Sequence, residues 1–162
     1  MMSGMKFTCA VRYDAPLAEV YAMLTDPAFR AHAMSAQQAR SCEVTVDGDT
    51  IAIDAVTPNT DIPGFARAFA GETTRSITTE AWRDGNVADF TVETPGKPSS
   101  ISGVRRLVPD GDGTLDTFEA EAKAKLPLIG GKIENLIAGQ FKSGTAKEQA
   151  VGATWLAGDR PA

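Results

Sequence analysis

The chain has 162 residues, of which 43% are hydrophobic and 23% charged, and its formal net charge is −5. This length suits one domain, which buries roughly 70% of its unfolded surface and needs neither metal nor disulfide for stability. The acidic balance argues against nucleic acid as a partner, because such binding depends on a basic face. It also disfavours stable anchoring on anionic membranes.

Cysteine usage and the N-terminus bear on the cellular compartment. Cys9 and Cys42 are the two cysteines, and both sit in alternating apolar patterns, so we expect buried free thiols. A disulfide would require an oxidising compartment, yet residues 1–6 lack the apolar core of a signal peptide. The apolar stretches are also far shorter than the roughly 20 residues of a membrane span. We therefore predict a cytoplasmic protein.

The N-terminal part predicts one strand followed by two short helices. Residues 6–13 alternate between apolar and polar, which is typical of a half-buried strand. Pro16 is well placed to open a helix, and apolar residues then recur at spacings of three and four up to Leu24. The pair Asp26-Pro27 begins the second short helix.

From residue 39 onward the apolar period changes to two, which predicts a run of β-strands. Asp47-Gly48-Asp49 is a tight hairpin signal between the first two strands of this run, and a short helical turn follows Pro63. Further strands are expected at residues 72–83, 86–94, 100–108 and 114–126. Because short turns join these strands, neighbouring strands must be antiparallel.

A long helix is predicted from about Gly131 to Leu156. Its apolar stripe comprises Ile133, Leu136, Ile137, Phe141, Val151 and Trp155. A flank of small residues runs beside the stripe: Gly139, Ser143, Ala146, Ala150 and Ala153. These small side chains should let the helix axis approach the sheet closely.

Gln140 projects into the middle of this apolar stripe. A buried amide without a partner would cost about 1–3 kcal/mol. Two alternatives therefore stay open for Gln140: either a neighbouring strand satisfies its amide, or the side chain faces a wet cavity and can touch a ligand.

The predicted order is strand, two short helices, six strands and a long helix, in one α+β domain over residues 1–162 with its core at about 6–156. A single antiparallel sheet with one long apolar-faced helix must curl around that helix to bury both faces. At its open end, such a curl leaves a space that core side chains do not fill.

This order and two short motifs resemble the START-like superfamily, also called SRPBCC or birch-pollen-allergen-like. An Ala-Pro pair at residues 15–16 precedes the first helix, and an Asp-Pro pair at 26–27 follows it. The resemblance covers about residues 6–156 and implies the helix-grip fold, a curved seven-stranded antiparallel sheet around a long C-terminal helix. Because members include START lipid-transfer domains and polyketide cyclases, it also implies a ligand cavity between sheet and helix.

Two further stretches resemble a narrower family of uncharacterised, mostly actinobacterial proteins. These are PGKP at residues 95–98 and PLIGGKIE at residues 127–134, with Trp155-Leu156 at the end of the long helix. That family has no established function. The resemblance therefore implies a fold and a cavity but no reaction.

The sequence contains no catalytic, cofactor or metal-binding signature. His32 is the single histidine, and without a Cys or carboxylate at ligand spacing we expect it on the surface or packed against a helix. Gly130-Gly131 fits neither a dinucleotide fingerprint nor a phosphate loop, so we expect a turn from sheet to helix there. We therefore predict no catalytic residue, no cofactor and no metal, and an enzyme is the less favoured hypothesis.

Two adjacent arginines, Arg105 and Arg106, lie in a strand whose alternation must point one of them to the concave face. An unpaired charge there is untenable. Either a carboxylate on another strand, such as Glu72, Glu80 or Asp89, pairs with it, or the arginine holds the carboxylate of a ligand. The sequence does not decide which arginine points inward.

We expect a mostly apolar cavity with Gln140 as a polar landmark. The candidate ligand-binding residues are Phe65, Phe69, Phe90, Ile137, Gln140 and Phe141. Phe65 and Phe69 lie in the segment 58–70, which should border the mouth together with the loop at 95–98. The phenylalanines can equally be ordinary core, because core and cavity wall are chemically the same.

The function predicted from these observations is binding or transport of an apolar or amphipathic small molecule, such as a lipid, isoprenoid or polyketide-like compound. One alternative is a polyketide cyclase or aromatase-like enzyme, which needs a poised acid or base; the available polar groups are Gln140, Arg105 or Arg106, Tyr13 and Asp89. Another is a protein-interaction module resembling chaperone activators, which needs an exposed apolar patch on the convex face. The ligand, and whether the chain forms a homodimer, stay open.

Overall fold

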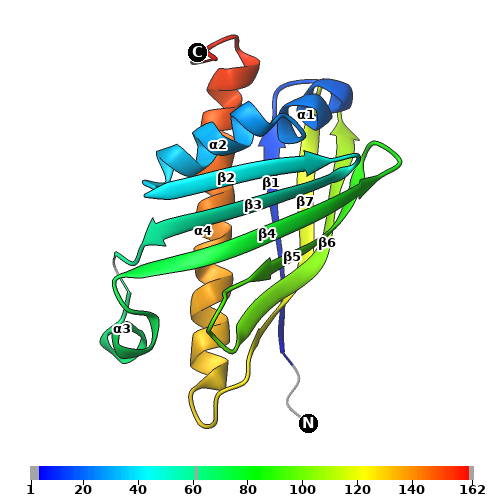
Figure 1. Cartoon of the computed structure of the whole chain (residues 1–162). Helices are drawn as coiled ribbons and strands as arrows, with labels where there is room; N and C mark the ends of the chain where they lie inside the picture. Colours follow the sequence, from blue (N-terminus) through cyan, green and yellow to red (C-terminus); the bar gives the residue numbers. More distant parts are fainter. Residues whose placement is uncertain (1–3, 61, 161–162) are drawn as a thin grey trace.

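The computed structural model describes residues 4–60 and 62–160, apart from the side chain of Phe69, and shows a curved sheet around one long helix (Figure 1). Seven strands form one antiparallel sheet in the order β1-β7-β6-β5-β4-β3-β2. The strands are β1 (Met5–Tyr13), β2 (Ser41–Asp47), β3 (Thr50–Pro58), β4 (Thr73–Arg83), β5 (Val87–Glu93), β6 (Ser99–Asp110) and β7 (Gly113–Ala124). The helices are α1 (Leu17–Leu24), α2 (Pro27–Ala36), α3 (Gly64–Ala70) and α4 (Gly130–Leu156). The predicted fold class is therefore confirmed.

Local chemistry explains where the N-terminal helices begin. Pro16 has an extended backbone and precedes α1, and Pro27 stands in the first turn of α2, where its missing N–H removes no hydrogen bond. The Asp26 carboxylate accepts a hydrogen bond from the backbone N–H of Ala28 at 2.9 Å and so caps α2. Helix α1 lies at one end of the sheet and α2 runs along β2, while α3 lies near the opposite ends of β3 and β4 (Figure 1).

Alternation along β7 follows the sequence prediction. One parity faces the interior, and its buried members are Thr114, Asp116, Phe118, Ala120, Ala122 and Ala124. The opposite parity carries Glu119 and Lys123 to the outer face. The strand ends at Ala124, two residues before the predicted end.

Helix α4 packs against one half of the sheet only. It lies along β1 and β7 and crosses α2, whereas β3, β4, β5 and β6 stand away from it. Small side chains permit this approach, because Ala120 and Ala122 of β7 and Ala138 of α4 are all buried. At the C-terminal end, the ring of Trp155 meets that of Phe29 of α2, with 5.3 Å between centroids.

The predicted flank of small residues on α4 does not make this close approach. Its members Gly139, Ser143, Ala146, Ala150 and Ala153 all lie outside the buried core. The residue that does lie against the sheet is Gly152, where an added Cβ would come within 2.6 Å of a ring carbon of Tyr13. The prediction was wrong because α4 rests on β1 and β7 through other residues. Gly139 and Ser143 instead line a pocket between α4 and the rest of the sheet, and the other members of the flank are exposed.

The outer face of the sheet is charged. Pairs of opposite charge lie on it, namely Arg75–Asp54, Arg83–Asp89, Arg106–Glu119 and Lys123–Glu121. The exposed large apolar residues among those described are Val46, Phe65, Val108 and Leu128, which lie on β2, α3, β6 and a loop. None of the helices in the described ranges has both the length and the apolar character required to cross a bilayer.

Replacing Phe118 by Ala should destabilise the protein by about 3–5 kcal/mol. Its ring is 4% exposed and packs edge-on against Phe90 and Phe141, so truncation leaves a cavity in the core. Urea unfolding followed by tryptophan fluorescence measures the loss. Val108→Ala is the control, because Val108 is 43% exposed and its truncation should change the free energy of unfolding by less than about 0.5 kcal/mol. A loss below about 1 kcal/mol for Phe118→Ala would contradict the assignment of this core.

Candidate functional site

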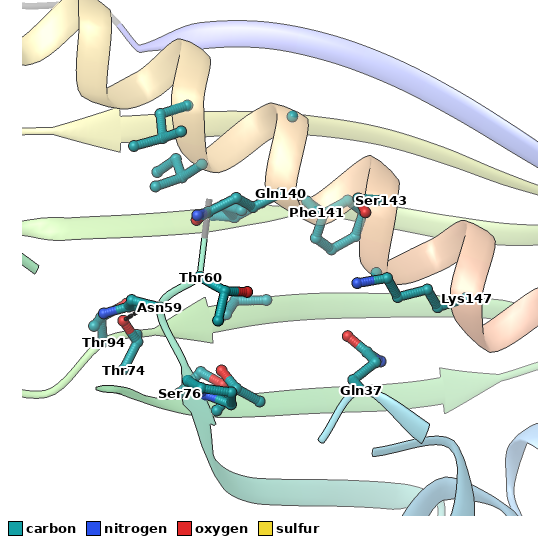
Figure 2. A pocket seen from close by; sticks show the side chains of 18 of the residues that line it. Gln37, Asn59, Thr60, Thr74, Ser76, Thr94, Gln140, Phe141, Ser143 and Lys147 are labelled. Atoms are coloured by element: carbon teal, nitrogen blue, oxygen red, sulfur yellow. Dashed lines mark hydrogen bonds between the residues drawn. The ribbon is translucent and has the colours of Figure 1, made fainter. Parts of the chain in front are cut away.

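A pocket of about 890 Å³ lies where α4 and the sheet separate (Figure 2). One wall is the segment 135–147 of α4, and the other comes from the end of β3 with residues 57–60 and from β4, β5 and β6. The C-terminal end of α2 closes one side. The pocket follows from the packing described above, because the backbone of α4 rests on β1 and β7 and stands away from β3 to β6, and side chains such as Phe90 and Phe141 bridge only part of that gap.

The wall of this pocket is more polar than the sequence predicts. Hydroxyl and amide groups come from α2, from both sides of the β3–β4 connection and from α4, including Gln37, Asn59, Thr60, Thr74, Ser76, Gln140 and Ser143 (Figure 2). Of the described residues that line it, Lys147 alone is charged. Apolar side chains line the same wall: Met34, Val92, Ile101, Leu136, Ile137 and Phe141. The expected apolar wall with one polar landmark is therefore replaced by a mixed wall suited to an amphipathic molecule.

The predicted site residues divide into three groups. Ile137, Gln140 and Phe141 line the main pocket, and Phe90 lines an inner extension of it. Phe65 is 45% exposed and lies outside the wall, with the Lys132 ammonium 5.8 Å from its ring centroid. The side chain of Phe69 lies outside the described residues.

Only small parts of the two segments predicted to border the pocket mouth line the pocket. Residues 57–60 line the pocket, but none of the described side chains of α3 does. The loop at 95–98 is likewise absent from the wall, although Thr94 and Ser100 on either side of it contribute.

Gln140 is exposed on the pocket wall, and its side chain points into the space between α4 and the sheet (Figure 2). No hydrogen bond joins its amide to another described residue. Of the two alternatives left open for this residue, the structure supports the one in which Gln140 faces a cavity.

An inner extension of about 170 Å³ continues from the main pocket toward α2. The two spaces share several wall residues, among them Met34, Gln140 and Phe141. Its side is aromatic: the rings of Phe90 and Phe141 stack with centroids 5.5 Å apart, and Phe118 meets both edge-on. Its floor consists of charged groups.

Arg105 is the centre of this charged floor. Its guanidinium is 2% exposed and forms a two-pronged pair with Asp116, with N–H to carboxylate distances of 2.9 and 2.6 Å. The same guanidinium donates to Glu80 and to Glu148, both at 2.9 Å. The sequence left open which arginine points inward; the structure shows Arg105 inside, and Arg106 on the outer face paired with Glu119.

Arg30 completes the cluster from α2. It donates to both carboxylate oxygens of Glu80, at 2.7 and 3.0 Å, and to the backbone carbonyl of Leu24. Its Nε lies 3.4 Å from a carboxylate oxygen of Glu148. Glu80 also accepts a hydrogen bond from the indole N–H of Trp82. The cluster thus joins α2, β4, β6, β7 and α4.

The pKa values reflect this mutual support. Burial by itself raises the pKa of Glu80, but the charges of Arg30 and Arg105 outweigh burial and lower that pKa to about 2. Burial raises the pKa of Asp116, and this rise exceeds the lowering effect of the Arg105 charge. Burial lowers the pKa of both arginines, yet the surrounding carboxylates raise it further than burial lowers it, so both stay charged.

Sequence reasoning named Glu80 as a partner for the inward arginine but missed Arg30, Asp116 and Glu148. The sequence around each of these three residues contained a pattern that could have identified it as facing inward. Asp116 has the inward parity of β7, Arg30 follows the buried Phe29 on α2, and Glu148 lies seven residues after Phe141, so it returns to the same helix face. No sequence pattern indicated that these residues lie close together, because their proximity depends on how the helices dock on the sheet.

The remaining polar candidates lie elsewhere. His32 sits on α2 with its ring 6.3 Å from that of Trp155, outside both pocket walls. Tyr13 is buried in the core beside the cluster, and its hydroxyl has no hydrogen-bond partner among the described residues. Cys9 and Cys42 are free, half-buried thiols on the two edge strands; burial raises the pKa of each.

The curved sheet, the C-terminal helix and the pocket between them define a protein of the helix-grip class. The chain belongs to the family described as "Protein of unknown function (DUF2505)", whose model matches residues 8–156. This membership agrees with the resemblance to an uncharacterised family seen in the sequence. Among curated proteins, no match is found.

Solved structures with the same fold differ widely in sequence. The protein TTHA0849 from Thermus thermophilus superposes with a TM-score of 0.65 at 18% identity, covering 91% of this chain and 93% of that one. The Zhui aromatase/cyclase from Streptomyces sp. R1128 gives a TM-score of 0.65 at 11% identity, over 91% and 90% of the two chains. Ara h 8.0201 gives 0.63 at 13% identity, over 91% and 97%. At these identities the likeness establishes the fold alone.

The neighbouring arginines offer a matched test of the charged cluster. Arg105→Met should cost about 3–5 kcal/mol, because it leaves the buried carboxylate of Asp116 without its partner and removes one of the two arginines that pair with Glu80. Arg106→Met removes an exposed pair with Glu119 and should cost less than about 1 kcal/mol. Equilibrium unfolding in urea at pH 7 measures both. Equal losses for the two variants would show that the cluster does not hold the helices on the sheet.

Proposed function

We propose that the protein binds, and carries, an amphipathic small molecule in the pocket between α4 and the sheet. The observation that supports this most directly is the pocket itself, whose volume of about 890 Å³ lies within the range of about 300–1,000 Å³ usual for ligand sites. A lipid, isoprenoid or polyketide-like compound has the size and the mixture of apolar and oxygen-bearing groups that this wall can accept.

The two kinds of wall suggest how such a molecule lies. Its apolar part would pack against Ile101, Ile137 and Phe141, and its polar groups would meet the hydroxyl and amide side chains of the same wall. Removing an apolar chain from water provides the driving force. The polar side chains add specificity, since each unmatched group would lose its hydrogen bonds to water.

A cyclase or aromatase activity is supported less well by the residues first considered for it. The guanidinium of Arg105 is engaged by three carboxylates, and Arg106 and Asp89 lie on the outer face in pairs of their own. Tyr13 lies outside both pocket walls. The protein-interaction hypothesis needs an exposed apolar patch on the convex face of the sheet, but charged pairs lie on that face. Binding therefore remains the function that the geometry supports best.

Gly139 offers a way to fill the pocket without disturbing the fold. It lies on the pocket wall, and a Cβ added there would meet no atom within 4 Å. Gly139→Trp should keep or raise stability, because glycine is a poor residue in a helix interior, and it should abolish uptake of the neutral dye Nile red. Fluorescence titration measures the uptake.

Gly131→Trp is the matched control for the filled pocket. Gly131 is also an exposed α4 glycine with open space around its Cβ position, but it lies outside the pocket wall. Its dye uptake should equal that of the wild type. Native mass spectrometry of freshly purified wild-type protein should in addition reveal a bound small molecule that Gly139→Trp lacks. Equal dye uptake by both variants, with no copurified molecule, would reject the proposed function.

Gln140→Leu tests the polar wall. Because Gln140 is exposed and has no hydrogen bond to another described residue, its replacement should change the free energy of unfolding by less than about 0.5 kcal/mol. The affinity for 1-dodecanol, measured by displacement of Nile red, should change about fivefold, the scale of one hydrogen bond. Ala146→Leu adds a similar side chain on α4 outside the pocket, and it should leave the affinity unchanged.

A further inference from the structure

The inner end of the pocket carries an excess of negative charge, and from this we infer that it accepts a ligand whose leading group is a protonated amine. The inference rests on the proposed binding function and adds to it the chemistry of the ligand's buried end. It depends on three features of the cluster of Arg30, Glu80, Arg105, Asp116 and Glu148: its charge balance, the occupation of its donors, and the position of one carboxylate.

The charge balance of the cluster favours a bound cation. Three carboxylates surround two guanidiniums, so with all three carboxylates ionised one negative charge has no counter-charge inside the cluster. The cluster lies in a part of the molecule where the side chains of Arg30, Glu80 and Arg105 are at most 5% exposed, so water screens this excess weakly. A cation that reaches the floor of the pocket would complete the balance.

The arginine donors are already used. Arg105 directs Nε and both terminal nitrogens at Asp116, Glu80 and Glu148. Arg30 directs its terminal nitrogens at Glu80 and the Leu24 carbonyl, and its Nε is buried against Glu148. The sequence left open that an inward arginine holds a ligand carboxylate. The geometry disfavours that alternative, because an incoming carboxylate would have to displace a carboxylate already bound.

Glu148 is the acidic group of the cluster that a ligand can reach. Its side chain is 13% exposed, against 4% for Glu80 and 0% for Asp116, and it lines the inner extension. One of its oxygens accepts from Arg105, while the other takes no hydrogen bond from a described residue and only lies near Nε of Arg30. That second oxygen can accept a hydrogen bond from an ammonium group, and such charge-assisted bonds are among the strong ones.

The walls around Glu148 suit the rest of such a ligand. The aromatic rings of Phe90, Phe118 and Phe141 line the same extension, and ring faces attract cations as well as apolar chains. The extension of about 170 Å³ opens into the larger pocket, where the remaining chain would lie. Lys147, the charged residue of the main pocket, lines that wider space (Figure 2) and is not among the residues that line the extension.

The test compares three probes with the same chain: dodecylamine, 1-dodecanol and dodecanoate, each below its aggregation concentration at pH 7. Displacement of Nile red gives their affinities. We expect dodecylamine to bind about tenfold or more tightly than 1-dodecanol, and dodecanoate to bind least well. Glu148→Gln keeps an oxygen for Arg105 but removes the charge, so it should reduce the preference for the amine to less than about twofold.

Glu119→Gln is the matched control. It removes the same charge from the outer face and should leave the preference intact, which separates a local effect from attraction of amines to an acidic protein. A second measurement needs no variant and follows the indole N–H signals of the two tryptophans by nuclear magnetic resonance. Dodecylamine should shift the indole N–H signal of Trp82, which donates into the cluster, and leave that of Trp155 in place.

The outcomes separate the inference from the function on which it rests. If 1-dodecanol and the amine bind equally, or if the preference survives Glu148→Gln, the protein binds amphipathic molecules but the inference about the amine is wrong. Tighter binding of dodecanoate, lost in Lys147→Gln, would also overturn it and assign the headgroup to the outer wall. Failure of all three probes to displace the dye would instead reject the binding function.

Discussion

The guanidinium of Arg105 is the point on which the arrangement of the molecule depends. It projects from β6 and bonds to carboxylates of β4, β7 and α4, and Arg30 brings α2 into the same cluster. Each of these ions was taken out of water at a cost of several kcal/mol, so the cluster is favourable only when all its partners are in place. It therefore ties α2 and the C-terminal half of α4 to the concave face of the sheet.

The pocket is the other consequence of this arrangement. With its C-terminal half held by the cluster and its length resting on β1 and β7, the backbone of α4 stands away from β3 to β6. The open space is lined by short polar side chains that cannot reach across it, such as Thr74, Ser76 and Ser143. Long apolar residues in place of Gly139, Ser143 and Gly144 would have filled the space and removed the site.

The backbone arrangement and the ligand choice of the protein are determined by different features of its sequence. Proteins that share this fold at 11%, 13% and 18% identity share the curvature of the sheet and the place of the helix, because these follow from strand pairing and from burying one helix. The chemistry of the wall is set by individual side chains, and those of this chain combine amides, hydroxyls and aromatic rings with a charged cluster at the inner extension. Ligand choice therefore has to be argued from these residues and not from the fold.

The sequence by itself determined the elements and their faces. Alternation along residues 114–124 placed Phe118 and the alanines inward, because side chains of a strand point to opposite faces in turn, and helical spacing identified the stripe of α4. These are local properties. The partner of Arg105 on α4, Glu148, is 43 residues away in the chain, and the pocket position of Gln140 depends on how far the helix leans toward β1. Both were decided only by the tertiary structure, because the docking of helix on sheet sums many contacts that no single stretch of sequence contains.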